Sequence, residues 1–358
     1  MKPVYFTLFV ICGVFITFAY SQEKNVDKQQ FIQNIEPKYA GSEFVTLEEL
    51  YKIPVDEYEQ YYFSDIWAMD VDSDTNLYVL DNQECTVTVF DKNGKFLRTM
   101  GGAGQGPGEL EEPGSLCILD GKIYIYEWFK GIKVWDLQGN YVDFFIKDSS
   151  DFVVFRAFDD FLLTVEGNSI NESLSETEYY FERYTLDLEK INTVARLEHK
   201  EKNGTFVPDL AFAVNSKRHI YFLTGRDEYK INIYSADGDI LKSFGREYKR
   251  IPYSRLLHEY KRKIRAEVRS EYPQVVRIIL IDDCDYVWVV LGECTMDCDA
   301  SYSVLSTIDI FNEDGEFLYT FECPHFVAWS FIKCGRLYSR PTGDDPNIRV
   351  FKIHYNIK

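Results

Sequence analysis

A short β-hairpin pattern recurs through the sequence and limits the possible folds more than any other feature. In each copy, alternating apolar residues end in an aromatic residue, and a polar turn then leads into a second alternating run. Such alternation is typical of half-buried strands, and Asn-Gly or Asp-Gly turns favour hairpins because glycine accepts positive φ angles. The copies are VTVFDKNGKFLRTMG from Val87, IKVWDLQGNYVDFF from Ile132, YYFERYTLDLEKINTVARL from Tyr179, INIYSADGDILKSFG from Ile231, STIDIFNEDGEFLYTF from Ser306 and the partial copy IRVFKI from Ile348.

The aromatic residue before the turn gives the period of the repeat. Successive spacings are 45, 49, 50, 77 and 40 residues, between Phe90, Trp135, Tyr184, Tyr234, Phe311 and Phe351. A second pair of short apolar runs precedes each hairpin, so one unit holds four strands every 45–50 residues. This is the length of one propeller blade. The sequence therefore predicts an all-β fold, a six-bladed β-propeller of four-stranded antiparallel blades.

We expect one propeller domain over residues 43–358. The sixth unit supplies only three strands, and we expect the segment EFVTLEELYKIPV from Glu43 to add the fourth and close the ring. The long 77-residue spacing contains apolar residues every fourth position, which predicts a helical insertion over about 246–273, before blade five. This insertion is basic, so Lys261, Lys263 and Arg265 could dock an acidic partner; a packed helix with a solvated charged face is the alternative.

The N-terminus predicts export. Lys2 precedes an apolar run, and Ala19 and Ser21 are small residues placed as in a cleavage site, which indicates a signal peptide over residues 1–21 and an N-terminal extension over 22–42. A retained anchor is the alternative. No later segment is long and apolar enough to span a membrane. We expect a periplasmic, extracellular or cell-surface protein, where cysteines can pair, and Cys294 and Cys298 are the candidate disulfide.

The stretch GGAGQGPGEL from Gly101 resembles a phosphate-binding loop but lacks its Gly-Lys-Ser/Thr ending. Glu109 follows the last glycine, and strand-like residues come next rather than a helix. We therefore expect a connection between two blades. The formal net charge of −19 also argues against a nucleic-acid partner, because phosphate binding needs a basic surface.

The stretch from Val89 to Val142, with the run GAGQGPGE at 102–109 after a strand ending in RTMG, resembles NHL-type repeats. It is more closely similar to the six-bladed β-propeller proteins of Bacteroidota, which are often secreted or lipid-anchored. The resemblance implies the propeller architecture and a familiar helical insertion before blade five, and it implies no particular substrate. Gly245-Arg246-Glu247 in blade four lacks the Gly-Pro-Gly-Glu continuation, and blade three lacks the glycine turn, so we expect these two blades to be irregular.

Candidate site residues lie where propellers bind ligands, at one mouth of the central axis. Loops after second strands contribute Asp81, Glu127, Trp128, Glu166, Arg226 and Arg340, and the starts of innermost strands contribute Asp65, Trp67, Arg156, Asp209, Arg277 and His325. Convergent carboxylates could hold Ca²⁺, and arginines could orient a carboxylate or phosphate. Ordinary solvated loop charges are the alternative. No histidine or cysteine spacing indicates a metal site, so we predict no metal or cofactor beyond that Ca²⁺.

Two functions remain open from the sequence. The first is an exported module that binds a small-molecule ligand or a protein, within an envelope complex, with no catalytic constellation. The second is a metal-assisted hydrolase or lyase acting on a lactone, sugar or peptide at the axial mouth.

Overall fold

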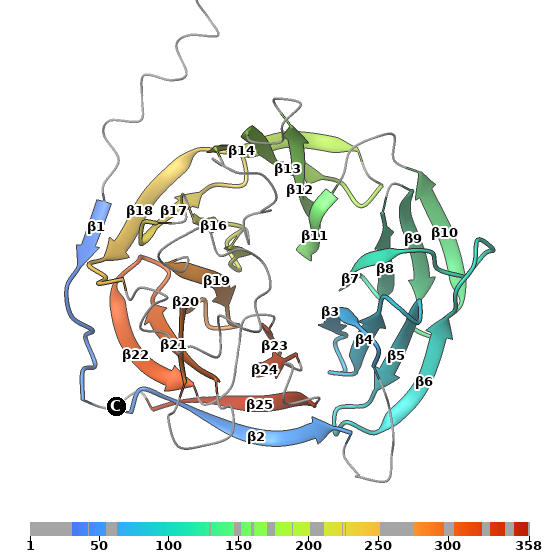
Figure 1. The fold of residues 1–358 in the computed structure, drawn as a ribbon, viewed down its shortest axis with the longest axis horizontal. Coiled ribbons are helices and arrows are strands. Elements are labelled where there is room, and N and C mark those ends of the chain that lie inside the picture. The colour runs from blue at the N-terminus through green and yellow to red at the C-terminus, as the bar shows by residue number, and fades with distance from the viewer. Residues whose placement is uncertain are drawn as a thin grey trace, which may run out of the picture.

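The computed structural model describes most of the chain between Phe31 and Asn356. The described ranges are 31–41, 43–54, 63–128, 130–146, 152–158, 161–169, 176–187, 189–200, 211–223, 225, 227–250, 275–296, 304–323, 330–340 and 347–356. Every element of regular secondary structure assigned within these ranges is a strand. The strands form six sheets around a central axis (Figure 1). The predicted all-β six-bladed propeller is confirmed.

Each blade is an antiparallel sheet whose four strands run outward from the axis in chain order, except in blade six. Blade one holds β3 (Ile66–Val71), β4 (Leu77–Asp81), β5 (Thr86–Phe90) and β6 (Phe96–Gly101). Blade two holds β7 (Pro113–Leu119), β8 (Lys122–Glu127), β9 (Gly131–Asp136) and β10 (Tyr141–Ile146). Blade three holds β11 (Phe152–Phe158), β12 (Phe161–Ser169), β13 (Glu176–Tyr184) and β14 (Lys190–Lys200).

The second half of the ring has the same plan with two additions from the N-terminus. Blade four holds β15 (Phe212–Val214), β16 (Ile220–Leu223), β17 (Lys230–Tyr234) and β18 (Ile240–Arg246), with β1 (Phe31–Asn34) outside β18. Blade five holds β19 (Val276–Ile281), β20 (Val287–Met296), β21 (Val304–Phe311) and β22 (Phe317–Cys323). Blade six holds β23 (Phe331–Lys333), β24 (Arg336–Ser339), β25 (Ile348–Tyr355) and, outermost, β2 (Val45–Ile53).

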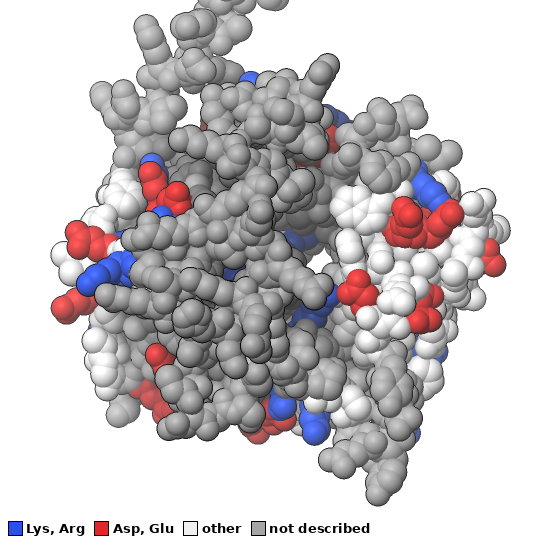
Figure 2. All heavy atoms as spheres, in the orientation of Figure 1, with Lys and Arg blue, Asp and Glu red and all other residues white. Residues whose placement is uncertain are grey.

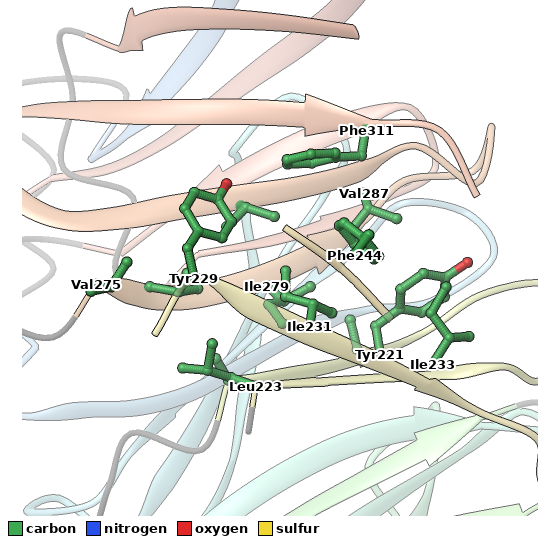
Figure 3. Close-up of a cluster of buried hydrophobic side chains, with 14 of the residues drawn as sticks. Tyr221, Leu223, Tyr229, Ile231, Ile233, Phe244, Val275, Ile279, Val287 and Phe311 are labelled. Carbon is green, nitrogen blue, oxygen red and sulfur yellow. The ribbon is translucent and has the colours of Figure 1, made fainter. Parts of the chain in front are cut away.

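The hydrophobic core is divided among the interfaces between neighbouring blades. Among the described residues, buried apolar side chains form six clusters, and each cluster joins two adjacent sheets. Figure 3 shows the cluster between blades four and five, where Phe244 of β18 lies near Val287 and Phe311 of blade five. A single blade would expose these faces to water, so the blades are stable only as neighbours in a ring.

The aromatic residue that marks the sequence repeat contributes to these interfaces. Trp135 is 1% exposed and lies in the cluster between blades one and two, and Phe311 is fully buried between blades four and five. The same holds around the ring, with the aromatic residue facing the preceding blade at Phe90, Tyr184, Tyr234 and Phe351. The period in the sequence is thus the period of the interfaces.

The N-terminal segment closes the ring, as the sequence predicts. Strand β2 pairs antiparallel with β25 along its whole length, from Val45 opposite Tyr355 to Ile53 opposite Ile348. Ile53 is 1% exposed and packs in the cluster that joins blade six to blade one. Blade six therefore combines strands from the N-terminal and C-terminal parts of the described chain, and β2 and β25 lie side by side in Figure 1.

Strand β1, which the sequence did not predict, precedes β2 in the chain and reaches blades four and five. The segment that contains β1 and β2 is called the strap. It pairs parallel with β18, with Phe31 opposite Ser243 (Figure 1). The Asn34 side-chain amide donates to the carbonyls of Gly245 and Gly315 at 3.1 and 2.9 Å, and its oxygen accepts from the Phe317 N–H at 3.0 Å. One side chain thereby joins the strap to two blades.

The glycine-rich stretch is the connection between blades one and two. It leaves β6 at Gly101 and reaches β7 at Pro113, with Leu110 fully buried between them. The Glu109 carboxylate turns back and accepts the Gly106 N–H at 2.8 Å, and a Cβ on Gly104 would lie 2.1 Å from that carboxylate. Gly104 also has φ of 158°, a backbone conformation that favours glycine, and a side chain there would have to displace the Glu109 carboxylate.

Other predictions concern residues that the structure leaves undescribed. The helical insertion, apart from 246–250, falls on residues 251–274, and with it Lys261, Lys263 and Arg265; Cys298 and the Cys294 side chain are also outside the described set. These expectations, like the signal peptide, stay predictions. The described part of the chain contains no helix with the length and apolar character needed to cross a membrane.

Replacing Trp135 with alanine should destabilise the propeller by about 3–5 kcal/mol, because it removes a buried indole from an interface that cannot collapse around the gap. Urea unfolding followed by circular dichroism measures this change. Leu97→Ala, at a residue that is 44% exposed, is the matched control and should shift the midpoint little. Equal shifts for both variants would contradict the interface model.

Deleting residues 43–55 should lower the free energy of unfolding by several kcal/mol or abolish folding, because it removes β2 and opens the ring between blades six and one. A truncation that ends just before Phe31 keeps both strap strands and serves as the control. Thermal unfolding compares the two. A 43–55 deletion as stable as the control would show that ring closure contributes nothing.

Candidate ligand-binding site at the axial mouth

The innermost strands of four blades share an irregularity near their first residue. The register with the second strand shifts there, and the extra residue is Trp67 in β3, Gly114 in β7, Val153 in β11 and Arg277 in β19. A β-bulge of this kind re-aims the side chain that it carries and is common beside functional sites. The bulges all lie at one end of the central axis, and we expect a binding site at that end.

Trp67 is the centre of a small group of side chains at this mouth. Its side chain is 42% exposed, although most large apolar residues of the described chain are buried. The Trp67 indole N–H donates to the Asp65 carboxylate at 2.6 Å. The Trp128 ring meets the Trp67 ring edge-on, with centroids 6.2 Å apart and planes at 88°. Two perpendicular indoles thus form an aromatic corner.

The aromatic corner is held from both sides. Tyr126 packs against Trp128 at 5.7 Å between ring centroids, and a Cβ on Gly114 would lie 2.4 Å from the Trp128 Nε1. A larger residue at 114 would displace the Trp128 ring. The bulged glycine of blade two therefore makes room for the indole that meets the bulged tryptophan of blade one.

Arg340 brings a positive charge to the same place. It follows β24 of blade six, and its guanidinium lies 3.5 Å from the Asp65 carboxylate with 22% of its side chain exposed. Burial lowers the pKa of Arg340, and the Asp65 charge partly offsets that shift. Three blades thus place two indoles, a carboxylate and a guanidinium together.

The three carboxylates predicted at the ends of second strands do not take part in the aromatic corner. They bond instead to nearby groups of their own blades. Asp81, Glu127 and Glu166 occupy equivalent register positions in blades one, two and three. Asp81 is 2% exposed and accepts the backbone N–H groups of Ser64, Asp65, Gln83 and Glu84 at 2.6–3.2 Å. This pattern supports a structural role, because such bonds order the loop around the mouth.

Glu127 and Glu166 also bond to groups of their own blades. Glu127 is fully buried, lies 3.0 Å from the Lys133 ammonium and accepts the Glu111 N–H. Burial raises the pKa of Glu127, while the Lys133 hydrogen bond and charge act to lower it. Glu166 accepts the Tyr184 hydroxyl at 2.6 Å. Of the carboxylates named here, only Asp65 lies against the aromatic corner.

Deeper along the axis lies a second set of charged residues, of which the sequence singled out only Arg156. Asp70 of β3 and Lys333 of β23 form an ion pair of 2.8 Å. Both belong to innermost strands whose other residues are mostly apolar, and a charge in such a strand was the signal that sequence reasoning could have used. Figure 2 shows Lys and Arg atoms inside the central opening, while most carboxylate atoms in view lie around it.

A separate pocket of about 300 Å³ lies between β1, blade four and blade five, lined by residues that include Phe31, Tyr229, Arg246 and Val275. Arg246 reaches Asp309 with two nitrogens, at 2.7 and 3.2 Å, and Tyr229 donates to the same carboxylate at 2.6 Å. The Arg246 charge in this pocket is therefore balanced by Asp309.

Within the described residues, no three His, Cys, Asp or Glu side chains are placed to share a metal ion. Asp72 lies in a polar turn, where its carboxylate accepts the N–H groups of Asp74 and Asn76 at 3.0 and 2.9 Å. Arg277 sits at the bulge of β19. Arg226, Asp209 and His325 are outside the described residues.

Solved structures with this architecture include proteins from Bacteroides. A DUF4221-family protein of Bacteroides vulgatus matches with a TM-score of 0.58 and 11% identity, over 87% of this chain and 99% of that one. The "Putative exported protein" of Bacteroides fragilis matches with a TM-score of 0.56 and 13% identity, over 91% and 99%. At such identities the likeness shows the fold alone. No curated protein matches the chain in sequence.

A family model described as "6-bladed beta-propeller" matches residues 47–276, which is more than half of the chain. That match spans the sequence from the closing strand β2 to the start of blade five. It agrees with the six sheets, the interblade clusters and the ring closure described above. The chain belongs to the 6-bladed beta-propeller family.

Proposed function

We propose that this protein is an exported binding module of the cell envelope that takes a small-molecule ligand at its axial mouth. The observation that carries the proposal is the exposed Trp67 indole, which sits at a bulge beside Trp128, Asp65 and Arg340. Exposing an indole to water costs free energy, and a mouth with few polar groups around an aromatic surface is typical of ligand sites.

The chemistry of this group suits a ligand that has a flat or ring-shaped apolar face and polar substituents. Such a face can stack on Trp67 or fill the corner with Trp128. Asp65 can accept a hydrogen bond and Arg340 can donate several in a fixed plane. Because the side chains come from three rigid blades, binding them loses little conformational entropy.

Trp67→Ala should weaken ligand binding while leaving the fold intact, because the side chain is exposed and contributes little to the interblade clusters. A library of sugars, aromatic acids and short peptides is screened by thermal shift, and hits are titrated by tryptophan fluorescence. We expect hits to bind at least tenfold more weakly to the Trp67→Ala variant, a change of about 1.4 kcal/mol.

Trp128→Ala should weaken the same hits, and Leu241→Ala, a 43% exposed residue on the outer strand β18, is the control that should not. A library without hits, or hits that bind the Trp67→Ala variant unchanged, would refute a ligand site at the aromatic corner. Stoichiometric Ca²⁺ or Zn²⁺ in the purified protein, lost in a Glu166→Ala variant, would instead favour a metal-assisted hydrolase or lyase.

A further inference from the structure

Three ionisable side chains belong to innermost strands along the central axis: Asp70 pairs with Lys333, and its charge also acts on Arg156. Asp70 and Arg156 stand at equivalent register positions, four residues after the first paired residue of β3 and β11. Lys333 ends β23 of blade six. Two positive charges therefore accompany one negative charge, within a protein whose formal net charge is −19.

The carboxylate of this group is already engaged. Asp70 holds the Lys333 ammonium at 2.8 Å and accepts the Ile118 N–H of blade two at 2.7 Å. These two bonds join the innermost strands of blades one, two and six. Asp70 consequently balances Lys333 and has little capacity left for a second cation.

Arg156 is different, because it forms no ion pair with any residue in the described ranges. Its guanidinium lies over the Phe212 ring, 4.9 Å from the centroid, and one nitrogen reaches the Phe212 carbonyl at the long distance of 3.5 Å. A guanidinium has five N–H donors in a fixed plane, so most of them are unused by the protein groups that the structure describes.

The surroundings of Arg156 make it unfavourable in free energy for the guanidinium to lack an ion pair. Burial lowers the pKa of the Arg156 guanidinium, and the field of Asp70 acts in the opposite direction. An arginine nevertheless stays charged at all physiological pH values. A charge that is partly withdrawn from water, with no ion-pair partner among the described residues, raises the free energy of the protein, and a bound anion would lower it.

We propose that Arg156 binds the anionic group of the ligand, a carboxylate, sulfate or phosphate, in the channel below the aromatic corner. The proposal rests on the proposed function, because the same ligand would enter through the mouth. Asp70 follows Trp67 by three positions on β3, which corresponds to about 10 Å along a strand. The ligand would thus carry its ring at the mouth and its negative charge about 10 Å deeper.

The anion site can be tested without knowing the ligand. Sulfate, phosphate and acetate are titrated into the purified mature protein by calorimetry, in chloride buffer of constant ionic strength, and the three anions distinguish the tetrahedral groups from the carboxylate. We expect at least one to bind, and Arg156→Gln to weaken it about tenfold or more because a charge-assisted bidentate contact is lost. Lys242→Gln, which removes a surface cation paired with Asp314, is the control and should leave binding unchanged.

A second variant keeps the test informative even if Arg156→Gln folds poorly. Asp70→Asn retains an oxygen for the Ile118 N–H but removes the negative charge that competes for Lys333. We expect this variant to bind the anion about fivefold more tightly or better, since it removes a nearby like charge. Damage to the fold would weaken binding instead.

The proposal is overturned if none of the three anions binds, if Arg156→Gln binds as the wild type does, or if Asp70→Asn binds no more tightly. Trp67→Ala should leave the affinity for these small anions unchanged, because they have no ring to stack. If the small anions bind as expected but the library yields no Trp67-dependent ligand, the proposed function is refuted and the anion site is supported. If the library yields Trp67-dependent ligands but no small anion binds, the anion site alone is refuted.

Discussion

The burial of apolar surface between neighbouring blades is the interaction on which the rest of this structure depends. Each blade is a thin sheet with two apolar faces, and each face is covered only by the next blade around the ring. A large aromatic residue such as Trp135 or Phe311 fills each of these interfaces. Because every interface needs two partners, one open junction would expose two faces, and closure by β2 protects the first and the last blade together.

This construction also explains where a functional site can form. The interfaces use the side chains that alternate across each sheet, so ordinary strand positions are committed to packing. The bulges of the innermost strands release single residues from that alternation, and they place Trp67 and Arg277 at the axial mouth without disturbing the interfaces. Rigid blades then hold these residues in place, while the loops need only the local bonds that carboxylates such as Asp81 provide.

Much of the fold could be predicted because its signals are local. The aromatic before each turn, the alternation on both sides of it and the glycine-rich link at 101–110 each specify their own strand pairs, and their period specifies six units. The closing strand could be inferred from a missing partner in the last unit. Strand β1 could not, because FIQN is four residues long and its pairing with β18 depends on Asn34 meeting Gly245 and Gly315, which are more than 200 residues away.

The candidate site likewise has features that local sequence patterns predict and features that depend on contacts between distant residues. Sequence alone determined the repeat, the strand order within each blade and a set of polar residues near the axis, since these follow from alternation and turn chemistry within 50 residues. Only the tertiary structure decided which of those residues meet. Asp81 and Glu127 bond to their own loops, whereas Trp67, Trp128 and Arg340 converge from three blades, and Asp70 pairs with Lys333 from the far end of the chain. The reason is physical: contacts across a closed ring depend on how six sheets pack, and no local pattern records that geometry.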